Sequence, residues 1–169
     1  KILVNYNLPP VLQLVLVSLF GGVIAALFGF FVGASTLRLR GDYLAIITLA
    51  FGEIVKYIVQ NLDFLGGATG LNNIPRIIDF SNSYFIVVIS IVIIAMAMTS
   101  RKGKEILSIR EDEIAAENIG MRLSRIKLYG FAFSAFFAGV GGSLFAHNIG
   151  ILKPDKFGFL FSIEILVMV

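Results

Sequence analysis

Long apolar runs alternate with short polar segments along this chain. Residues 11–37 and 80–99 carry no charged side chain, and the run 127–152 has Lys127 only at its start. An α-helix needs about 20 mainly apolar residues to cross roughly 30 Å of hydrocarbon. We therefore expect transmembrane helices over 11–37, 80–99 and 127–152.

Two further runs are interrupted by charge. The run 43–60 contains Glu53 and Lys56, and the run 157–169 contains Glu164. All these runs are much longer than the roughly 10 alternating residues of a membrane β-strand. The pattern predicts an all-α fold, a polytopic integral membrane helical bundle with about five spans, as one domain over 1–169.

The two ends of the chain suggest a segment of something longer. Residue 1 is Lys rather than Met, and the apolar run that opens at 157 has only just begun when the chain reaches Val169. We therefore expect an internal part of a longer membrane protein, with its last span incomplete.

Composition supports lipid as the solvent. Hydrophobic residues make up 57% of the 169, and charged residues 15%, against about 25% charged in soluble domains. A soluble domain of this size could not hide so much apolar surface. The chain has no Cys and a net charge of +3, which disfavours a disulfide scaffold and a nucleic-acid partner.

The distribution of Lys and Arg predicts which loops are cytoplasmic, because these residues accumulate on that side. If the chain crosses at each expected span, nine basic residues share one side: Arg38, Arg40, Arg101, Lys102, Lys104, Arg110, Arg122, Arg125 and Lys127. Four lie on the other side: Lys1, Arg76, Lys153 and Lys156. The loop 101–126 is therefore predicted to be cytoplasmic.

Small residues recur every four positions in two of the spans. The first span has Gly21, Ala25, Gly29 and Gly33, and the fourth has Gly130, Ser134, Ala138, Gly142 and Ala146. Such stripes let helix backbones approach closely in membranes. Helix packing is the favoured interpretation, with a substrate-lining role as the alternative.

Charges within spans are expensive and usually face the protein interior or a polar path. Lys56 follows Glu53 at i+3, on the same side of the helix. An ion pair or snorkelling of Lys56 explains these charges as well as a pathway role does. Glu164 is harder to interpret, and His147 is expected to be an interfacial or hydrogen-bonded residue.

The predicted outer loop is rich in glycine. Gly66, Gly67 and Gly70 fall within five residues, and Thr69 lies among them. Glycines allow positive φ angles and leave backbone groups open to a ligand. A phosphate-binding loop would continue with Lys and then Ser or Thr, and these residues do not follow here. The preferred interpretation is therefore a tight connection that folds back toward the membrane.

The cytoplasmic loop predicts a short helix over about 109–119. Ser108 and Glu111 have the spacing of a capping box, and Glu111, Asp112 and Glu113 place negative charge near the positive end of the helix dipole. Gly120 fits the C′ position. The helix is too short to span, and its acidic start disfavours anionic lipid, so we expect it to dock onto another protein.

Several stretches resemble one family of transport proteins. They are 110–121 (REDEIAAENIGM), 134–142 (SAFFAGVGG), 40–54 (RGDYLAIITLAFGEI) and the loop 66–71. Together they resemble the permease subunits of bacterial branched-chain amino acid ABC importers of the LivM type. The resemblance covers most of the chain in the same order, whereas any one stretch alone would be weak.

The resemblance implies a coupling helix that fits a cleft on an ATPase subunit. It assigns this role to Glu111, Asp112, Glu113, Ala115, Ala116 and Gly120. Ile114 stands where the wider ABC-importer pattern has Glu, which leaves the contacts of the acidic residues open. A translocation path would involve Thr48, Glu53, Gly66, Gly67, Thr69 and Gly70.

The family further implies a bacterial inner-membrane location and several partners. These are a second permease subunit, two ABC ATPases and an extracytoplasmic solute-binding protein. This chain would then be no enzyme and hold no cofactor, with ATP and Mg²⁺ on the partner ATPase. Related permeases carry urea, short amides or sugars, so the cargo stays open.

Two other functional classes remain as alternatives. An ion-coupled secondary transporter would use Glu53, Glu164 or His147 as its coupling group. A membrane-embedded hydrolase would need a nucleophile with a base, or a set of metal ligands. With no Cys and one His in the chain, the hydrolase is the weakest of the three.

Overall fold

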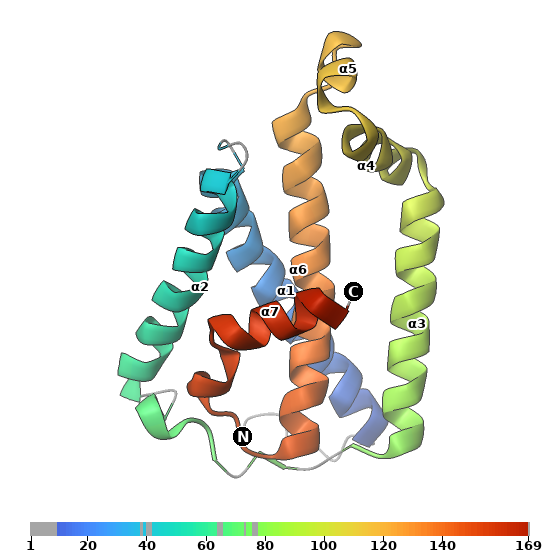
Figure 1. Ribbon diagram of the computed structural model, residues 1–169. Coiled ribbons are helices and arrows are strands. Elements are labelled where there is room, and N and C mark those ends of the chain that lie inside the picture. Colours follow the sequence, from blue (N-terminus) through green and yellow to red (C-terminus); the bar gives the residue numbers. More distant parts are fainter. Residues whose placement is uncertain are drawn as a thin grey trace. The chain divides into compact units, whose positions relative to one another are not determined.

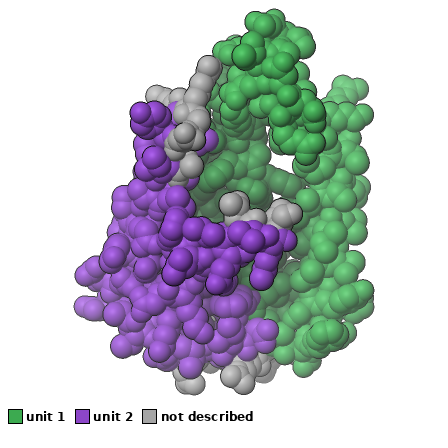
Figure 2. Space-filling model, viewed as in Figure 1, with its two compact units in different colours: residues 1–38, 77–144 green, residues 39–76, 145–169 purple. Residues whose placement is uncertain are grey.

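A computed structural model of the chain describes residues 10–37, 39, 42–63, 66–72, 74, 75 and 78–168. Its described elements are helices apart from one isolated β-bridge (Figure 1), so the all-α prediction is confirmed. The prediction of the cytoplasmic side counted Lys and Arg residues, and four of these lie outside the described residues: Lys1, Arg38, Arg40 and Arg76. The chain forms two compact units, 1–38 with 77–144 and 39–76 with 145–169 (Figure 2).

The first unit contains the long apolar helices. Its elements are α1 (Pro10–Thr36), α3 (Phe80–Thr99), α4 (Arg101–Glu111), α5 (Glu113–Asn118) and the greater part of α6 (Leu123–Ile149). Within the part of the chain that the structure describes, three helices are long and apolar enough to cross a membrane: Val11–Thr36 of α1, α3 and α6. They coincide with three of the expected spans, and their outward faces are apolar and exposed, as lipid requires.

The second unit contains the helix with charges inside it. Its elements are α2 (Asp42–Asn61), the 3₁₀ turn η3 (Gly67–Thr69), the end of α6, a second 3₁₀ turn η4 (Pro154–Phe157) and α7 (Phe159–Met168). An α-helix rises about 1.5 Å per residue, so the 20 residues of α2 are long enough to span. The passage of α2 and α7 through the membrane, and the single-domain arrangement, stay predictions.

The fourth expected span is shifted toward the N-terminus. It was predicted over 127–152, but α6 runs from Leu123 to Ile149. The early start reflects apolar contacts, because Leu123 is buried and Ile126 packs beside it. The early end reflects Gly150, whose φ of 77° lies in the left-handed region that terminates helices.

Glycines of α1 allow close contact with α6. A Cβ atom built on Gly29 would lie 2.5 Å from the Cβ of Ala135, and one on Gly22 would lie 2.8 Å from the Phe136 ring. From the other side, a Cβ on Gly139 would lie 2.5 Å from that of Ala25. All three distances are far below van der Waals contact, so the two helices can pack this way only because these positions lack side chains.

The stripe predicted on the fourth span is not the face that meets α1. That face carries Phe131, Ala135 and Gly139, one residue round the helix from the predicted series. Of the predicted residues, Gly130 faces Ile106 of α4, Ser134 and Ala138 are exposed, and a Cβ on Gly142 would meet nothing within 4 Å. Four-residue spacing recurs on both faces of α6, so spacing alone could not select between them.

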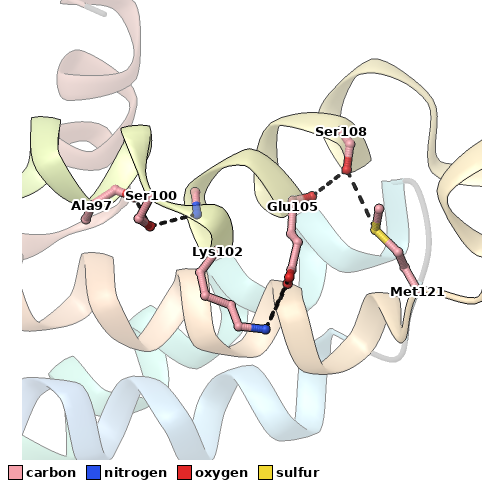
Figure 3. Close-up of polar contacts among 7 residues, drawn as sticks. Ala97, Ser100, Lys102, Glu105, Ser108 and Met121 are labelled. Carbon is pink, nitrogen blue, oxygen red and sulfur yellow. Dashed lines mark hydrogen bonds and ion pairs between the residues drawn. The ribbon is translucent and has the colours of Figure 1, made fainter.

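A sharp bend at Ser100 joins α3 to α4. The Ser100 hydroxyl donates to the carbonyl of Ala97 at 2.6 Å and accepts the amide of Gly103 at 3.2 Å, so it serves the ends of both helices (Figure 3). Gly103 is buried, and any Cβ there would collide with the carbonyl oxygens of Ala97 and Met98. The start of α4 is therefore held tightly against the end of α3.

Substitution of Gly139 tests the packing of α1 on α6. We expect Gly139→Ala to destabilise the full-length protein by about 1–3 kcal/mol, the usual cost of overpacking. Gly142→Ala is the matched control, because its Cβ has open space within the described residues. Thermal unfolding of both variants in detergent checks this, and equal midpoints for the two would contradict the packing.

Candidate functional site: the α4–α5 segment and the charged face of α2

The segment between α3 and α6 contains two helices rather than the single helix predicted over 109–119. Helix α4 ends at Glu111 and α5 begins at Glu113. Asp112 separates them with an extended backbone, and its Oδ1 accepts the amides of Ile114 and Ala115 at 2.9 and 3.0 Å. Asp is among the best N-cap residues, and this cap starts a new helix.

The predicted capping box at Ser108 and Glu111 is therefore wrong. Ser108 lies inside α4, where its hydroxyl bonds the carbonyl of Glu105 at 2.8 Å and faces the sulfur of Met121 (Figure 3). Glu111 ends α4 and pairs with Arg110 on the exposed surface. The same sequence offers two acceptable caps, and Asp112 reaches two amides where Ser108 would have reached one.

The end of α5 follows the prediction for Gly120. Its φ of 89° is left-handed, and its amide donates to the carbonyl of Glu117 at 2.9 Å. The next amide, of Met121, donates to the carbonyl of Ala116 at 3.2 Å. These two bonds make a Schellman motif, which turns the chain back toward α6.

A small hydrophobic cluster holds this segment together. Ile109 of α4, Ala116 of α5 and Leu123 of α6 are buried against one another, with Met121 and Ile126 packed beside them. We did not expect such a core from the sequence. The sequence feature that marks this core is the set of apolar residues at positions 109, 116 and 123, which lie on three different helices.

Lys127 adds an ionic link between α5 and α6. Its Nζ lies 2.6 Å from Oε1 of Glu113, and both side chains are partly buried. Paired charges that are partly shielded from water interact more strongly than exposed ones. Together with the cluster, this bond attaches α5 to the start of α6.

The outer surface of α5 combines apolar and acidic side chains. Ala116, predicted as a docking residue, is only 3% exposed and contacts the cluster instead. Ile114 and Ile119 are 73% and 77% exposed, and Ala115 and Glu117 are exposed beside them. The sequence prediction did not select these two isoleucines, although large apolar side chains on a short acidic helix are a recognisable signal.

The second candidate site is the charged face of α2. Oε2 of Glu53 lies 3.3 Å from Nζ of Lys56, and Oε1 accepts the amide of Phe159, the first residue of α7, at 3.0 Å. Gln60, one further turn along α2, hydrogen-bonds Asp155 of η4. The ion pair that the sequence left open therefore exists, and Glu53 also caps another helix.

The glycine loop forms tight backbone turns. Gly66, Gly67 and Gly70 have φ angles of 84°, 55° and 75°, as predicted for positions that need glycine. A Cβ on Gly70 would collide with the carbonyl oxygen of Leu152. Thr69 bonds the carbonyl of Gly66 at 2.7 Å, so these residues build a compact connection.

An antiparallel bridge secures that connection. Leu71 and Leu152 exchange both backbone hydrogen bonds, at 3.0 and 2.9 Å, and the amide of Ile74 donates to Gly150 at 3.1 Å. His147 is 9% exposed, and its Nδ1 lies 3.0 Å from the carbonyl oxygen of Pro75. Its hydrogen-bonded position agrees with the expectation.

The proposed path residues do not all gather in one place. Thr48 is bonded to the carbonyl of Leu44 and lies five residues before Glu53, which places the two about 140° apart around α2 at 3.6 residues per turn. Glu164, on α7, is exposed. In the described ranges no three His, Asp or Glu side chains are grouped as metal ligands.

Comparison with known proteins identifies the family. Residues 2–169 match the family described as branched-chain amino acid transport system / permease component. The chain belongs to this family. The resemblance found in the sequence is thereby confirmed, and the apolar helices α1, α3 and α6 are those of an integral membrane protein.

Two relatives carry the same name, high-affinity branched-chain amino acid transport system permease protein LivM. The protein from Salmonella typhimurium strain LT2 is 35% identical over 183 residues, and that from Escherichia coli K12 is 36% identical over 183 residues. Each alignment covers 88% of this chain and 43% of the relative, so the chain spans less than half of their length. No solved structure matches the chain.

Replacing Asp112 tests the cap of α5. We expect Asp112→Ala to weaken the helix by about 0.5–2 kcal/mol, and Asp112→Asn to retain most of the cap. Hydrogen exchange in the full-length protein measures this directly, at the amides of Ile114 and Ala115. Unchanged protection in Asp112→Ala would show that Asp112 does not begin the helix.

Proposed function

We propose that the protein is a permease subunit of an ABC importer that moves branched-chain amino acids across the bacterial inner membrane. ATP would be hydrolysed, with Mg²⁺, on a separate ATPase chain and transmitted through α5. Family membership over residues 2–169 supports the permease role, and both named relatives act in branched-chain amino acid transport by their names.

The surface of α5 is the observation that carries the coupling proposal. Ile114 of α5 and Ile119, the C-cap residue that follows it, are exposed, and the other exposed residues of α5 are polar or small. Exposed apolar side chains rimmed by polar ones mark protein interaction sites. On the opposite side, Ala116 and the Glu113–Lys127 pair attach α5 to α6, so a force on α5 would reach a membrane helix.

The charge distribution supports a cytoplasmic position for this segment. All described Lys and Arg residues of the first unit lie between the end of α3 and the start of α6: Arg101, Lys102, Lys104, Arg110, Arg122, Arg125 and Lys127. Loops rich in Lys and Arg face the cytoplasm. An ATPase in the cytoplasm would meet α5 there.

The proposal includes the other components of such an importer. They are a second permease subunit, two ABC ATPases and an extracytoplasmic solute-binding protein. Urea, short amides or sugars remain the alternative cargoes, and Thr48, Glu53, Gly66, Gly67, Thr69 and Gly70 remain a proposed path. Of these, Glu53 has the strongest support, because the glycines have backbone roles in the connection.

An ion-coupled transporter is less well supported. Its main candidate, Glu53, is already paired with Lys56 and accepts the amide of Phe159. A coupling carboxylate has to gain and lose its ion during transport.

Crosslinking at α5 tests the coupling proposal. We expect Ile114→Cys in the full-length protein, assembled with its partners, to crosslink to the ATPase subunit, with a yield that changes when nucleotide is added. Lys104→Cys is the control, because Lys104 is also exposed but belongs to α4. Equal labelling at both positions, or crosslinks to lipid alone, would contradict docking by α5.

Polar replacement of both isoleucines gives a functional readout of the same surface. Burial of one such side chain contributes about 1.5–3 kcal/mol, or roughly tenfold or more in an equilibrium constant. We expect Ile114→Ser with Ile119→Ser to reduce ATP-driven leucine uptake by at least about tenfold at unchanged membrane levels. Lys104→Ser serves as the control, and full uptake by the double variant would refute the proposal.

A further inference from the structure

A cavity of about 380 Å³ lies in the second unit, against the C-terminal half of α2. Its walls are apolar apart from one cation, Lys56, and they include Val55, Val59, Leu71, Leu152 and Phe157. Ligand sites in proteins are mostly apolar hollows of roughly 300–1,000 Å³ with a few placed polar groups. The size and lining of this cavity match that description.

Lys56 also lines a second hollow of about 460 Å³, whose walls carry Glu53, Asp155, Lys156 and Glu164 beside apolar residues. The ion pair therefore stands where an apolar cavity meets a partly charged one. Lys56 and Glu53 are 19% and 34% exposed at their side chains, and the pair is neutral overall. A neutral pair of opposite charges complements a ligand that itself carries one positive and one negative group.

Both charged groups have bonding capacity left. An ammonium has three donors and a carboxylate about four acceptor positions. Glu53 uses one oxygen for Lys56 and the other for the amide of Phe159. The remaining positions can bond an α-carboxylate and an α-ammonium without breaking the cap of α7.

The irregular chain before α7 runs beside the C-terminal half of α2. Asp155 bonds Gln60, a Cβ on Gly158 would lie 3.5 Å from Nζ of Lys56, and the amide of Phe159 bonds Glu53. From Gln60 to Glu53 is seven residues, or roughly 10 Å along the helix axis. Non-helical backbone at membrane depth occurs where it is buried in protein or lines a polar cavity, and broken helices build transport sites in other membrane proteins.

We propose that this cavity is a binding site for the cargo, a zwitterionic α-amino acid with a branched aliphatic side chain. The side chain would occupy the apolar cavity, Lys56 would bind the α-carboxylate and Glu53 the α-ammonium. This inference rests on the proposed function and adds the site and its chemistry. It also explains why two opposite charges are kept next to an apolar hollow.

Gly52 provides a probe position inside the cavity. It lines the hollow, and a Cβ built on it meets nothing within 4 Å of the described residues. A Cys side chain there would project into the cavity without a clash. Ile54, two residues on, is exposed and does not line this cavity, so it is a matched position on the same helix.

Protection from thiol labelling tests the site in the complete importer. We expect leucine to slow maleimide labelling of the Gly52→Cys variant about tenfold at roughly nine times its Kd, by mass action. The Ile54→Cys variant should label at the same rate with and without leucine. Val59→Cys, also in the lining, gives the same test if Gly52→Cys fails to assemble.

Analogues test the role of the two charges. Leucinol lacks the carboxylate and 4-methylpentanoate lacks the ammonium, so both should protect much less than leucine at equal concentration. Unchanged labelling at positions 52 and 59, in an importer that still takes up leucine with ATP, would overturn this site and leave the proposed function standing. If the unmodified importer showed no ATP-driven amino acid uptake, that result would instead overturn the proposed function.

Discussion

The backbone amides at a helix start and the carbonyls at a helix end need partners from outside the helix, and the described breaks at Ser100, Asp112 and Phe159 supply them. Ser100 serves both ends of the bend between α3 and α4. Asp112 begins α5 and the Schellman bonds end it. The start of α7 is served by a side chain far away in sequence, Glu53. At these described breaks the chain therefore changes direction where a partner for its backbone is available.

Side-chain contacts link the candidate site on α5 to the membrane helices. In the first unit, α5 is attached to α6 by the cluster of Ile109, Ala116 and Leu123 and by the Glu113–Lys127 pair. Helix α6 is in turn packed against α1 at Gly139, with no side chain between the backbones. A displacement of α5 would therefore be carried by closely packed elements, which transmit strain well.

In the second unit, one carboxylate combines structure and charge. Glu53 caps α7 and holds Lys56 at the border of an apolar cavity. In the predicted span α2 such a charge would be costly, and its retention is explained when the group has more than one partner. The structural and pathway interpretations of Glu53 are thus compatible, since the bonds that position it leave acceptor positions unused.

Sequence reasoning was most successful where one physical effect dominates. The uncharged runs identified α1, α3 and α6 because apolar length decides a membrane helix, and Gly120 ended α5 because its left-handed φ favours glycine. It failed where two local choices were nearly equal. The N-cap of α5 is Asp112 and not Ser108. The face of α6 that contains Gly139 packs against α1, and the face that contains Gly142 does not.

The long-range contacts could not be read from local patterns. The bonds from Glu53 to Phe159 and from His147 to Pro75 join residues 106 and 72 positions apart. The cluster around Ala116 likewise combines three helices. Exposure decides which face of α5 is free, and that depends on contacts which periodicity within one short helix does not reveal.

The most direct measurement is an experimental structure of the full-length protein in a lipid nanodisc with its ATPase subunits bound. The coupling account predicts that Ile114 and Ile119 are buried in a cleft of the ATPase, while Ala116 still packs against Ile109 and Leu123 of its own chain. A structure in which α5 lies in lipid or water, with the ATPase seated on other residues, would contradict the account.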